Sequence, residues 1–514
     1  MVGVRPLIRA CRRSWYSCAR EPTRGRKLKC DPRIDYAAAV SCDSPESAGP
    51  ELVIGLVSPV GMNTTDLANS VQRSLSDSGY IATIIKLSSL LPDGEEPPPG
   101  EAEDQRIRRL MSVGNKFCAD NADSAAIARL GVAAIRAQRL KLLRADGNTD
   151  PASKIIASRP GTAYILQSLK RLEEVQLLRS IYGEQFILIG SQGSVAQRTA
   201  NLFERNLSAT DIPGKEAAVR RLFQIDASDP EPHGQNVTDT YPQADFFIGN
   251  NNSDEIDRAI TLLFGKPEAP TVGEYAMYMA RASRARSLAA SRKVGAAIVV
   301  DGFVVSTGYN DVPEGQTTDV VQGIDTSEQF KRESLLDTLQ RLKDAGMLTD
   351  AVEADEQGVA QAAEALKKGA LMSTIEYQRA VHAEARAIDE ATIRGISPAG
   401  GTLYVTTFPC HLCYKHALSV RLDRIEYIEP YPKSRAVEMF GKGAEDKLVP
   451  FSGVAPRRFM QIFDDRPAPM SVPPGIFKAY DRSAAKPLLG PLRDDEDRAG
   501  GERTAVNGLK EEYR

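Results

Sequence analysis

The stretch T-L-Y-V-T-T-F-P-C-H-L-C, residues 402–413, places a short apolar strand directly before a helix that carries two cysteines. The strand is expected at 402–407, and Pro409 suits the first turn of the helix, where a missing backbone N–H does no harm. Cys410 and Cys413 are three residues apart, so both sulfur atoms lie on one helix face and point at one ion. The pair therefore predicts two ligands of a metal site.

A third ligand precedes this pair in H-A-E, residues 382–384, which is separated from Pro409 by 24 residues. His382 supplies an imidazole, and three protein ligands leave the fourth tetrahedral position of a zinc ion for water. Glu384 is not needed as a ligand, and it is the candidate general acid and base. A structural zinc site is the alternative, but such a site would require a fourth protein ligand and would leave Glu384 without a role. The pattern H-x-E…P-C-x-x-C is the one that zinc-dependent nucleobase deaminases carry.

The sequence on both sides of these motifs alternates between helical and strand-like segments. The expected elements are a helix at 274–290, strands at 294–300 and 304–309, a helix at 382–394, the strand at 402–407, a helix from Cys410 and a strand at 424–428. A polar insert at 311–376 interrupts them and carries 14 acidic residues against six basic ones. Because the insert contains no His or Cys, we expect one zinc ion per chain.

The first half of the chain opens with an apolar strand, E-L-V-I-G-L-V at 51–57, followed by a helical pattern at 67–78. Further strands are expected at 80–87, 186–190 and 244–249, and long helices at 122–144 and 166–182. Strands that alternate with helices predict a parallel α/β sheet. The Gly- and Pro-containing segment 264–271 is expected to link this sheet to the second half.

Between the first strand and the first helix, five residues stand where a phosphate-binding loop would lie: Gly55, Ser58, Gly61, Asn63 and Thr64. A functional P-loop needs Gly-Lys at the place of Asn63 and Thr64, with the lysine on the β- and γ-phosphates. Backbone N–H groups at the helix N-terminus are still able to hold a phosphate. We therefore favour nucleotide sensing or scaffolding over phosphoryl transfer. Lys170, Arg171 and Arg198 are candidate replacements for the lysine, with a solvated helix face as the alternative.

Residues 271–464 resemble the cytidine and deoxycytidylate deaminase superfamily. The resemblance is carried by V-G-A-A-I-V at 294–299, S-T-G-Y-N at 306–310 and L-Y-V-T-T-F-P-C-H-L-C at 403–413. It implies an α/β/α domain in which Asn310 holds the nucleotide sugar and the backbone of Ala383 meets the pyrimidine edge. It also implies that Glu384 takes a proton from the attacking water and delivers protons to N3 of cytosine and to the departing amine. These enzymes often carry Asn two residues after the catalytic Glu, whereas this chain has Arg386 at that position.

The chain is also similar over about 51–464 to bacterial anti-phage deoxycytidylate deaminases, which fuse a P-loop-like domain to a deaminase domain. Four further motifs carry this likeness: 51–61, L-L-R-S-I-Y-G at 177–183, E-P-Y-P-K-S at 429–434 and G-V-A-P-R-R at 453–458. The likeness implies a degenerate P-loop NTPase-like domain at 49–266 and a zinc deaminase domain at 271–464. The implied reaction converts dCTP, dCMP or both to the deoxyuridine nucleotides, which depletes the cytidine nucleotide pool during phage infection.

This similarity also suggests partners and further contacts. A nucleotide effector at the P-loop-like domain, a regulatory RNA and a homo-oligomer are expected, and no membrane. Lys433 and Ser434 are candidate contacts to substrate phosphate, with a surface turn as the alternative.

Composition limits the classes of protein that fit this chain. The 514 residues include 65 Lys and Arg against 68 Asp and Glu, and this near-neutral balance excludes binding to nucleic acid or anionic lipid through bulk charge. No apolar run approaches the ~18 residues of a membrane span. Seven cysteines, an odd number, do not fit a disulfide framework, so a reducing, cytoplasmic compartment is expected.

Both ends of the chain are rich in charged residues. Residues 1–48 form a basic arm expected to be disordered, with an organelle transit peptide as the alternative, and 481–514 are expected to form a disordered, solvated tail. A deaminase of single-stranded DNA or tRNA would favour a basic channel with stacking aromatics, whereas residues 271–464 hold 23 basic and 26 acidic residues. A non-enzymatic nucleotide- or RNA-sensing scaffold is the other alternative, and the complete zinc motif argues against it.

Overall fold

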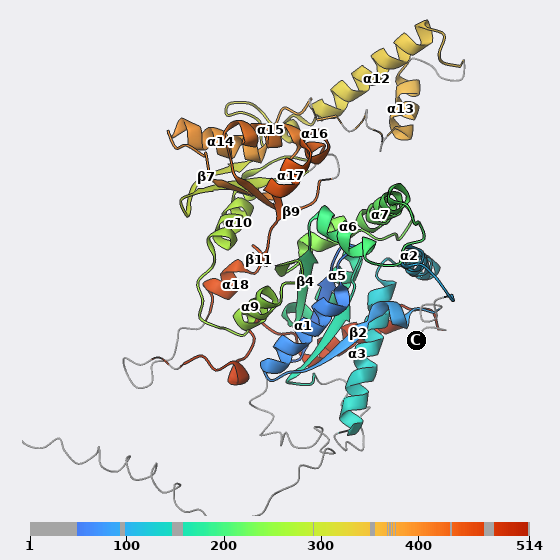
Figure 1. Cartoon of the computed structure of the whole chain (residues 1–514), viewed down its shortest axis with the longest axis vertical. Helices are drawn as coiled ribbons and strands as arrows, with labels where there is room; N and C mark the ends of the chain where they lie inside the picture. Colours follow the sequence, from blue (N-terminus) through green and yellow to red (C-terminus); the bar gives the residue numbers. More distant parts are fainter. Residues whose placement is uncertain are drawn as a thin grey trace, which may run out of the picture. The chain divides into compact units, whose positions relative to one another are not determined.

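The computed structural model of the chain describes residues 49–92, 98–145, 158–290, 292–349, 355–366, 369, 372, 374–375, 377–431, 434–466, 477 and 479–511. The expected basic arm, residues 1–48, lies outside these described residues. Two β-sheets organise the rest (Figure 1).

The first sheet has the strand order β11-β5-β4-β1-β3-β2. Its strands are β1 (Leu52–Val57), β2 (Ile81–Lys86), β3 (Thr162–Gln167), β4 (Phe186–Gln192), β5 (Phe246–Gly249) and β11 (Gly453–Val454). The pairs among β1 to β5 are all parallel, as the sequence pattern predicts. β11 pairs antiparallel with β5, so a segment that follows the deaminase-like motifs adds a strand to this sheet.

Alternating side chains of β1 enter two different cores, as is expected when both faces of a parallel sheet are covered. Leu52, Ile54 and Leu56 pack with helices α1 and α9, whereas Val53 and Val57 pack with α3 and α5. The helices of this part are α1 (Thr64–Asp77), α2 (Glu103–Asp120), α3 (Ala126–Ala145), α5 (Leu172–Tyr182), α6 (Val195–Phe203), α7 (Ile212–Ala227), α8 (Val237–Thr240) and α9 (Ser253–Leu263). Short 3₁₀ turns are η1 (Leu87–Leu90), η2 (Gly183–Gln185) and η3 (Tyr241–Gln243).

One strand of this sheet departs from the sequence prediction. The expected helix at 166–182 begins only at Leu172, and the preceding residues form the buried strand β3. The run T-A-Y-I-L-Q is short and apolar, and such a run does not distinguish a strand from a helix by its periodicity. Its place between β1 and β2 makes it a central strand.

The second sheet has the order β10-β9-β8-β6-β7. Its strands are β6 (Gly295–Val300), β7 (Phe303–Tyr309), β8 (Thr402–Thr407), β9 (Arg424–Glu429) and β10 (Leu448–Pro450). β6 is antiparallel to β7 and β8, and β8, β9 and β10 are parallel. Helix α10 (Val272–Ser283) packs on one face, while α14 (Ala383–Ile393) and α15 (His411–Ser419) pack on the other (Figure 1). This is the expected α/β/α arrangement.

Two glycines of the quoted motifs let helices touch this sheet. A β-carbon at Gly295 would lie 1.9 Å from the carbonyl oxygen of Ala280 in α10. A β-carbon at Gly308 would lie 2.0 Å from the carbonyl oxygen of Ala383, the first residue of α14. Only glycine permits such close approach, so Gly308 fixes where α14 begins relative to β7.

The insert at 311–376 contains α11 (Asp319–Gln322), α12 (Thr326–Asp344) and α13 (Glu356–Ala365), with a small core of its own between α12 and α13. The remaining elements are the 3₁₀ turns η4 (Arg284–Arg286) and η6 (Arg482–Ala484), and helices α16 (Ala436–Phe440), α17 (Lys442–Lys447), α18 (Phe459–Phe463) and α19 (Asp495–Asn507). Among the described residues, no helix combines the length and apolar character that crossing a membrane requires.

Helix α19 corrects the expectation of a disordered, solvated tail at 481–514. Its Arg498 and Glu502 are 1% exposed and pair with each other at 2.6 Å. Glu502 also accepts from Arg139 of α3 at 3.0 Å, and Arg139 binds Glu51 at 2.6 Å. Charges that look solvated in the sequence are therefore buried, because partners from distant segments neutralise them.

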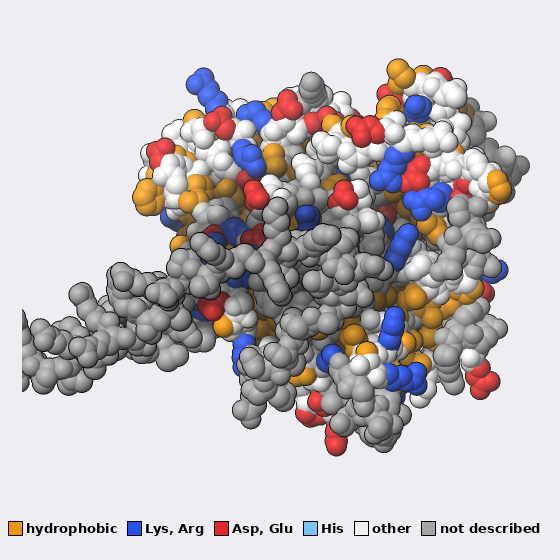
Figure 2. Space-filling view, turned by 60° about the horizontal axis from the view of Figure 1, so that its bottom comes forward, with side chains coloured by type: hydrophobic (Ala, Val, Ile, Leu, Met, Phe, Trp, Pro, Cys, Tyr) orange, Lys and Arg blue, Asp and Glu red, His pale blue; other side chains and the backbone are white. Residues whose placement is uncertain are grey.

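Charged side chains of both signs are interspersed on the face of the molecule shown in Figure 2. Among the described residues of that face, basic and acidic groups alternate over short distances. This mixture agrees with the near-neutral net charge of the sequence.

Candidate metal centre and active site

Three predicted ligands converge where two helices begin. His382 is the N-cap residue of α14, and Cys410 is the N-cap residue of α15, with Cys413 in the first turn of the same helix. The Cys410 sulfur accepts a hydrogen bond from the Cys413 backbone N–H at 3.4 Å. Helix N-termini carry partial positive charge, so this position stabilises thiolates.

The ligand atoms lie at metal-site spacing. His382 Nδ1 is 3.4 Å from Cys410 Sγ and 3.3 Å from Cys413 Sγ, and the three ligand atoms all lie within 4.8 Å of one another. Both cysteines are buried. One imidazole and two thiols form a donor set that zinc prefers, and three protein ligands leave one tetrahedral position open. His382, Cys410 and Cys413 thus fit a single zinc ion, as the sequence analysis predicts.

Gln378 orients the histidine ligand, and the sequence analysis missed it. Its side-chain oxygen lies 2.7 Å from His382 Nε2, the ring nitrogen that faces away from the cysteines. A proton held on Nε2 leaves the Nδ1 lone pair for a metal, which is the usual role of such an outer partner. Gln378 belongs to no motif, and the four-residue spacing to His382 was the one signal in the sequence.

Glu384 lies in the first turn of α14, beside the three ligands. The side chain is 4% exposed, and this burial raises the pKa of its carboxyl group to about 7, while the neighbouring His382 acts in the opposite direction. A carboxyl group with a pKa near neutrality can both accept and donate a proton at physiological pH.

Contacts among the three ligands shift their pKa values. The hydrogen bond between the two cysteines and the nearby His382 lower the pKa of Cys410, and the same bond raises the pKa of Cys413. The Cys410 hydrogen bond in turn raises the pKa of His382.

Asn310 follows β7 and is engaged with the neighbouring loop. Its side-chain oxygen accepts from the Val294 backbone N–H at 2.7 Å and from the Ser287 hydroxyl at 3.0 Å, while its amide donates to the Arg292 carbonyl at 2.9 Å. One amide hydrogen is left for another acceptor. Asn310 therefore ties the end of β7 to the loop that contains Ser287, Arg292 and Val294.

Arg386, the residue that departs from the family pattern, ties the start of the insert to the site. Its guanidinium donates to the carbonyl oxygens of Asp311 and Val312, both at 3.1 Å, and lies over the Tyr309 ring at 4.5 Å. Arg386 thus holds the segment that directly follows Asn310.

A cavity of about 410 Å³ lies next to Gln378, although the three ligands and Glu384 do not line it. It is lined by Asn310 and by Gln378, which also contacts the histidine ligand. Lys331 of the insert and Arg379, which follows the insert, also line the cavity. Arg379 pairs with Asp319 at 2.7 Å. The cavity wall therefore combines two amides with two cations and four acidic residues.

The remaining predicted substrate contacts have different surroundings. Ala383 is fully buried at the N-terminus of α14. The Ser434 hydroxyl donates to the Pro409 carbonyl at 2.8 Å, and so supports the residue that precedes Cys410. Lys433 lies outside the described residues.

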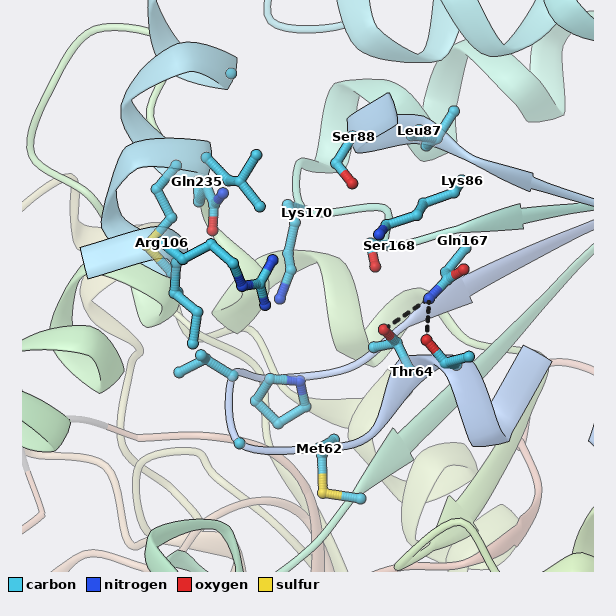
Figure 3. Close-up of a pocket in the computed structure, with 18 of the residues that line it drawn as sticks. Met62, Thr64, Lys86, Leu87, Ser88, Arg106, Gln167, Ser168, Lys170 and Gln235 are labelled. Carbon is cyan, nitrogen blue, oxygen red and sulfur yellow. Dashed lines mark hydrogen bonds between the residues drawn. The ribbon is translucent and has the colours of Figure 1, made fainter. Parts of the chain in front are cut away.

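The predicted phosphate-binding residues lie in β1, in the loop that follows it and at the start of α1, and each makes different contacts. Gly55 is inside β1, where a β-carbon would meet the Leu169 side chain at 2.6 Å, so it packs in the core and does not line the loop. Gly61 has φ +93° and touches the α6 backbone at Arg198. Asn63 caps α1 by accepting from the backbone N–H groups of Thr65 and Asp66. Ser58 Oγ is buried, and Thr64 Oγ1 accepts from Gln167 at 2.9 Å (Figure 3).

Of the candidate replacements for the P-loop lysine, Lys170 reaches the loop. Its ammonium donates to the Ser58 carbonyl and to Asp226 Oδ1, both at 2.7 Å. The second Asp226 oxygen accepts from the Val60 backbone N–H at 2.7 Å. Arg171 instead pairs with Glu174, and Arg198 lies over the Phe223 ring.

Comparison with known proteins agrees with the metal centre. Residues 270–429 match the family described as the cytidine and deoxycytidylate deaminase zinc-binding region. The chain is 30% identical over 146 residues to the deoxycytidylate deaminases of the enterobacteria phages T4 and T2, covering 28% of this chain and 71% and 73% of theirs. A crystal structure of the dCMP deaminase from cyanophage S-TIM5, in complex with dCMP and dUMP, matches at 19% identity and a TM-score of 0.23, over 36% of this chain and all of that one. The chain belongs to the cytidine and deoxycytidylate deaminase family.

Proposed function

We propose that this protein deaminates deoxycytidine nucleotides hydrolytically, converting dCMP, dCTP or both to the deoxyuridine nucleotides and ammonia. One observation carries the proposal: a His, Cys, Cys ligand set with the buried carboxyl group of Glu384 beside it. A structural zinc site would have no use for that carboxyl group. The relatives in phages T4 and T2 are deoxycytidylate deaminases, which supports the substrate class.

Zinc, when bound by His382, Cys410 and Cys413, supplies the Lewis acidity that makes water a nucleophile at neutral pH. Glu384 accepts a proton from the water that attacks C4 of cytosine, and passes it to N3. It then transfers the second proton of that water to the exocyclic amine, which leaves as ammonia when the C4–N4 bond breaks. The raised pKa of Glu384 suits a group that must take up and release protons in one cycle.

The neighbouring side chains would position the nucleotide. Gln378 keeps the His382 ring in place through the 2.7 Å contact. Asn310 has an amide hydrogen for the sugar, and Lys331 and Arg379 in the cavity next to Gln378 suit its phosphate. Ala383, Lys433 and Ser434 stay proposed contacts to the substrate.

A polynucleotide deaminase is the second candidate, and the same cavity disfavours it. Four acidic residues of the insert, Asp311, Asp319, Asp325 and Glu328, line the cavity together with the two cations. Such a wall repels the many phosphates of a strand more than the phosphate group of a single nucleotide. We therefore favour free nucleotides, and in a phage-infected bacterium the reaction would deplete the cytidine nucleotide pool in the cytoplasm.

Ammonia release from dCMP, dCTP and a cytosine oligonucleotide tests the proposal. We expect release from one or both nucleotides, and a loss of about 10²–10⁴-fold in Glu384→Gln because proton transfer contributes that much. Metal analysis should find one zinc per chain in both proteins. Wild-type release by Glu384→Gln would contradict the mechanism, and release from the oligonucleotide alone would favour the second candidate.

A further inference from the structure

A second cleft, also of about 410 Å³, lies between the two sheets. One wall comes from α5, η3 and β5 of the first sheet, and the other from α10, η4, β8 and β9 of the second. Phe247 and Ile428 lie at its floor and belong to one buried core that both sheets share. The two walls therefore rest on a single packed core. None of the zinc ligands, Glu384 or the predicted phosphate-binding residues lines this cleft.

Three motifs quoted in the sequence analysis meet at this cleft. L-L-R-S-I-Y-G contributes Arg179, E-P-Y-P-K-S contributes Glu429, and G-V-A-P-R-R contributes Arg457. These side chains are far apart in the sequence, and the function proposed above uses none of them. The fold thus gathers charged groups that have no other assigned role.

Positive charge exceeds negative charge in the lining. Four arginines line the cleft, namely Arg179, Arg281, Arg284 and Arg457. Glu429 is the one acidic residue among the described residues of the lining. Its carboxylate is already used, because it accepts from Arg284 at 2.6 Å and from the Thr407 hydroxyl at 3.1 Å. An anion is therefore the natural complement of the cleft.

The guanidinium groups have N–H donors to spare. Arg284 uses Nη1 for Glu429, and Arg179 uses Nη2 for the Gln243 carbonyl at 2.6 Å and for Asp245 at 3.3 Å. The other nitrogens of these two groups reach no acceptor among the described residues. Arg281 makes no hydrogen bond or ion pair within the described part of the chain, and it is exposed, so a ligand can reach it from solvent. Each guanidinium carries five N–H donors, so many of them stay free.

Two further observations indicate an unfilled site. Thr406 is 3% exposed and lines the cleft, and its hydroxyl accepts from the Gly295 backbone N–H at 3.1 Å, which leaves its own proton for an acceptor. Partial desolvation and the neighbouring Arg284 lower the pKa of Arg281, while Glu429 acts in the opposite direction. An anion beside Arg281 would offset the repulsion from Arg284.

The remaining lining favours a compact ligand. Its apolar residues Ala244, Phe247, Ile428 and Ala455 are at most 7% exposed, so they offer little surface to an aromatic ring. A phosphate group has several acceptor oxygens, and guanidinium groups bind them in pairs. One phosphate carries about two negative charges at neutral pH. Two linked phosphate groups therefore match four arginines on two walls better than one group does.

We propose that this cleft binds a compact compound with two or more linked phosphate groups, of which inorganic pyrophosphate is the simplest. One phosphate accepts from Arg281, Arg284 and Thr406, and the other accepts from Arg179 and Arg457 on the facing wall. The ligand thereby connects the two sheets. The site is separate from the zinc centre and does not depend on the proposed deamination, so Glu384→Gln should bind pyrophosphate as the wild type does.

The test is calorimetric titration of the zinc-loaded, full-length chain with inorganic pyrophosphate in a buffer without phosphate. We expect one saturable site per chain, which Arg281→Ala weakens by about tenfold, the value of a charge-assisted hydrogen bond in a partly solvated site. Because Arg281 binds no described residue, its loss removes no internal contact, and the Tm without ligand should stay at the wild-type value. Arg281→Lys keeps the charge but loses the paired donors, so it should recover only part of the affinity.

Two control variants locate the binding. Arg220→Ala changes an exposed arginine of α7 outside the cleft, and Lys86→Ala changes a cation in the pocket that follows β1. Both should keep the wild-type affinity. Chelation of the zinc ion by pyrophosphate would be the same in every variant and would not produce a difference. A loss in Lys86→Ala without one in Arg281→Ala would place pyrophosphate in the other pocket and overturn the proposal.

Competition shows which compound supplies the phosphate groups. If ATP displaces pyrophosphate and also loses affinity in Arg281→Ala, the ligand is a phosphate chain carried by a larger molecule; if ATP does not compete, the ligand is the free anion. Both results support the proposal. Three results overturn it: no saturable binding of pyrophosphate, equal affinity in Arg281→Ala and Arg220→Ala, or displacement by citrate as effective as by pyrophosphate. Excess pyrophosphate should also raise the Tm of the wild type more than that of Arg281→Ala.

Discussion

Two strand-to-helix junctions of this chain share a local design and use their polar groups differently. At the second sheet, β8 leads into α15 through Cys410, and the polar atoms of the junction face His382 across 3.4 Å or less. At the first sheet, β1 leads into α1 through residues 58–63, whose polar groups bind Lys170, Asp226 and their own helix. The junction between β8 and α15 thus offers its sulfur atoms to an outside ion, whereas the groups named after β1 are bound within the protein.

This difference predicts which property a substitution changes. Side chains at the metal centre serve a ligand, so their loss should reduce activity more than folding stability. Side chains around the loop serve the protein itself, so their loss should reduce folding stability and leave activity intact. Substitutions in each region, measured for both activity and folding stability, test this difference.

The largest effect is expected at a zinc ligand. Cys413→Ala leaves two protein ligands, too few to hold zinc firmly. We expect the zinc content of the purified chain to fall far below one per chain, and ammonia release from dCMP to fall to the assay background. Cys118→Ala is the control, because Cys118 is equally buried but lies in the core of the first sheet. Full zinc content with wild-type turnover in Cys413→Ala would remove the basis of the comparison.

A smaller effect is expected one contact farther out. Gln378→Leu removes the acceptor for His382 Nε2, and loss of such an outer partner lowers metal affinity or activity by about 10–100-fold. Competition with a chromogenic chelator measures the affinity for zinc. Gln340→Leu, on the exposed surface of α12, should leave it unchanged. Equal affinity in both variants would mean that the histidine ring is held by packing alone.

The sequence predicts the metal centre better than its surroundings, for physical reasons. His382, Glu384 and the two cysteines sit at helix starts with fixed spacings, so their chemistry is local and visible in the sequence. Gln378 lies only four residues before His382, but it belongs to no motif, so its contact with the ring is visible only in the structure. The V-G-A and T-G-Y motifs do not reveal by themselves what their glycines do. In the structure, Gly295 and Gly308 set how closely α10 and α14 approach the sheet.

The fold shows the same division between local and distant causes. The apolar runs of β1, β4 and β6 are long enough to predict strands, whereas β3 merges in sequence with the helix that follows. Helix α19 could not be predicted from its own residues, because Arg498 and Glu502 are buried only through Arg139 and Glu51. A charged segment is therefore predicted to be solvent-exposed as long as its partners elsewhere in the chain are unknown.

The next effect in size is one of stability, in the loop of the first sheet. Asp226→Ala removes the acceptor for Val60 and the partner of Lys170, and should lower the free energy of unfolding by about 2–3 kcal/mol, less than a fully buried pair because Lys170 is partly exposed. Urea unfolding measures this loss. Asp254→Ala, at an exposed position in α9, should cost about 0.5 kcal/mol or less.

The activity of Asp226→Ala decides whether the two regions are independent. Below the unfolding transition, its turnover of dCMP should match that of the wild type, because no contact of Asp226 reaches the metal centre. A turnover loss as large as that of Gln378→Leu would show instead that the loop and the metal centre act together.

The smallest effect is expected in the cavity next to Gln378, and it rests on the proposed function. Lys331 is a partly solvated cation, so its attraction for a substrate phosphate is worth about 1 kcal/mol, or about fivefold in KM. Lys331→Ala should raise the KM for dCMP by that factor and leave kcat unchanged, while Lys343→Ala, on the same helix but outside the cavity, should do neither. Added salt should shrink the difference between the variants, because screening weakens the ion pair. Deoxycytidine, which has no phosphate, should not distinguish Lys331→Ala from the wild type. If kcat fell together with the rise in KM, Lys331 would belong with the residues that position the reacting base, and the boundary of the metal centre would extend into the insert.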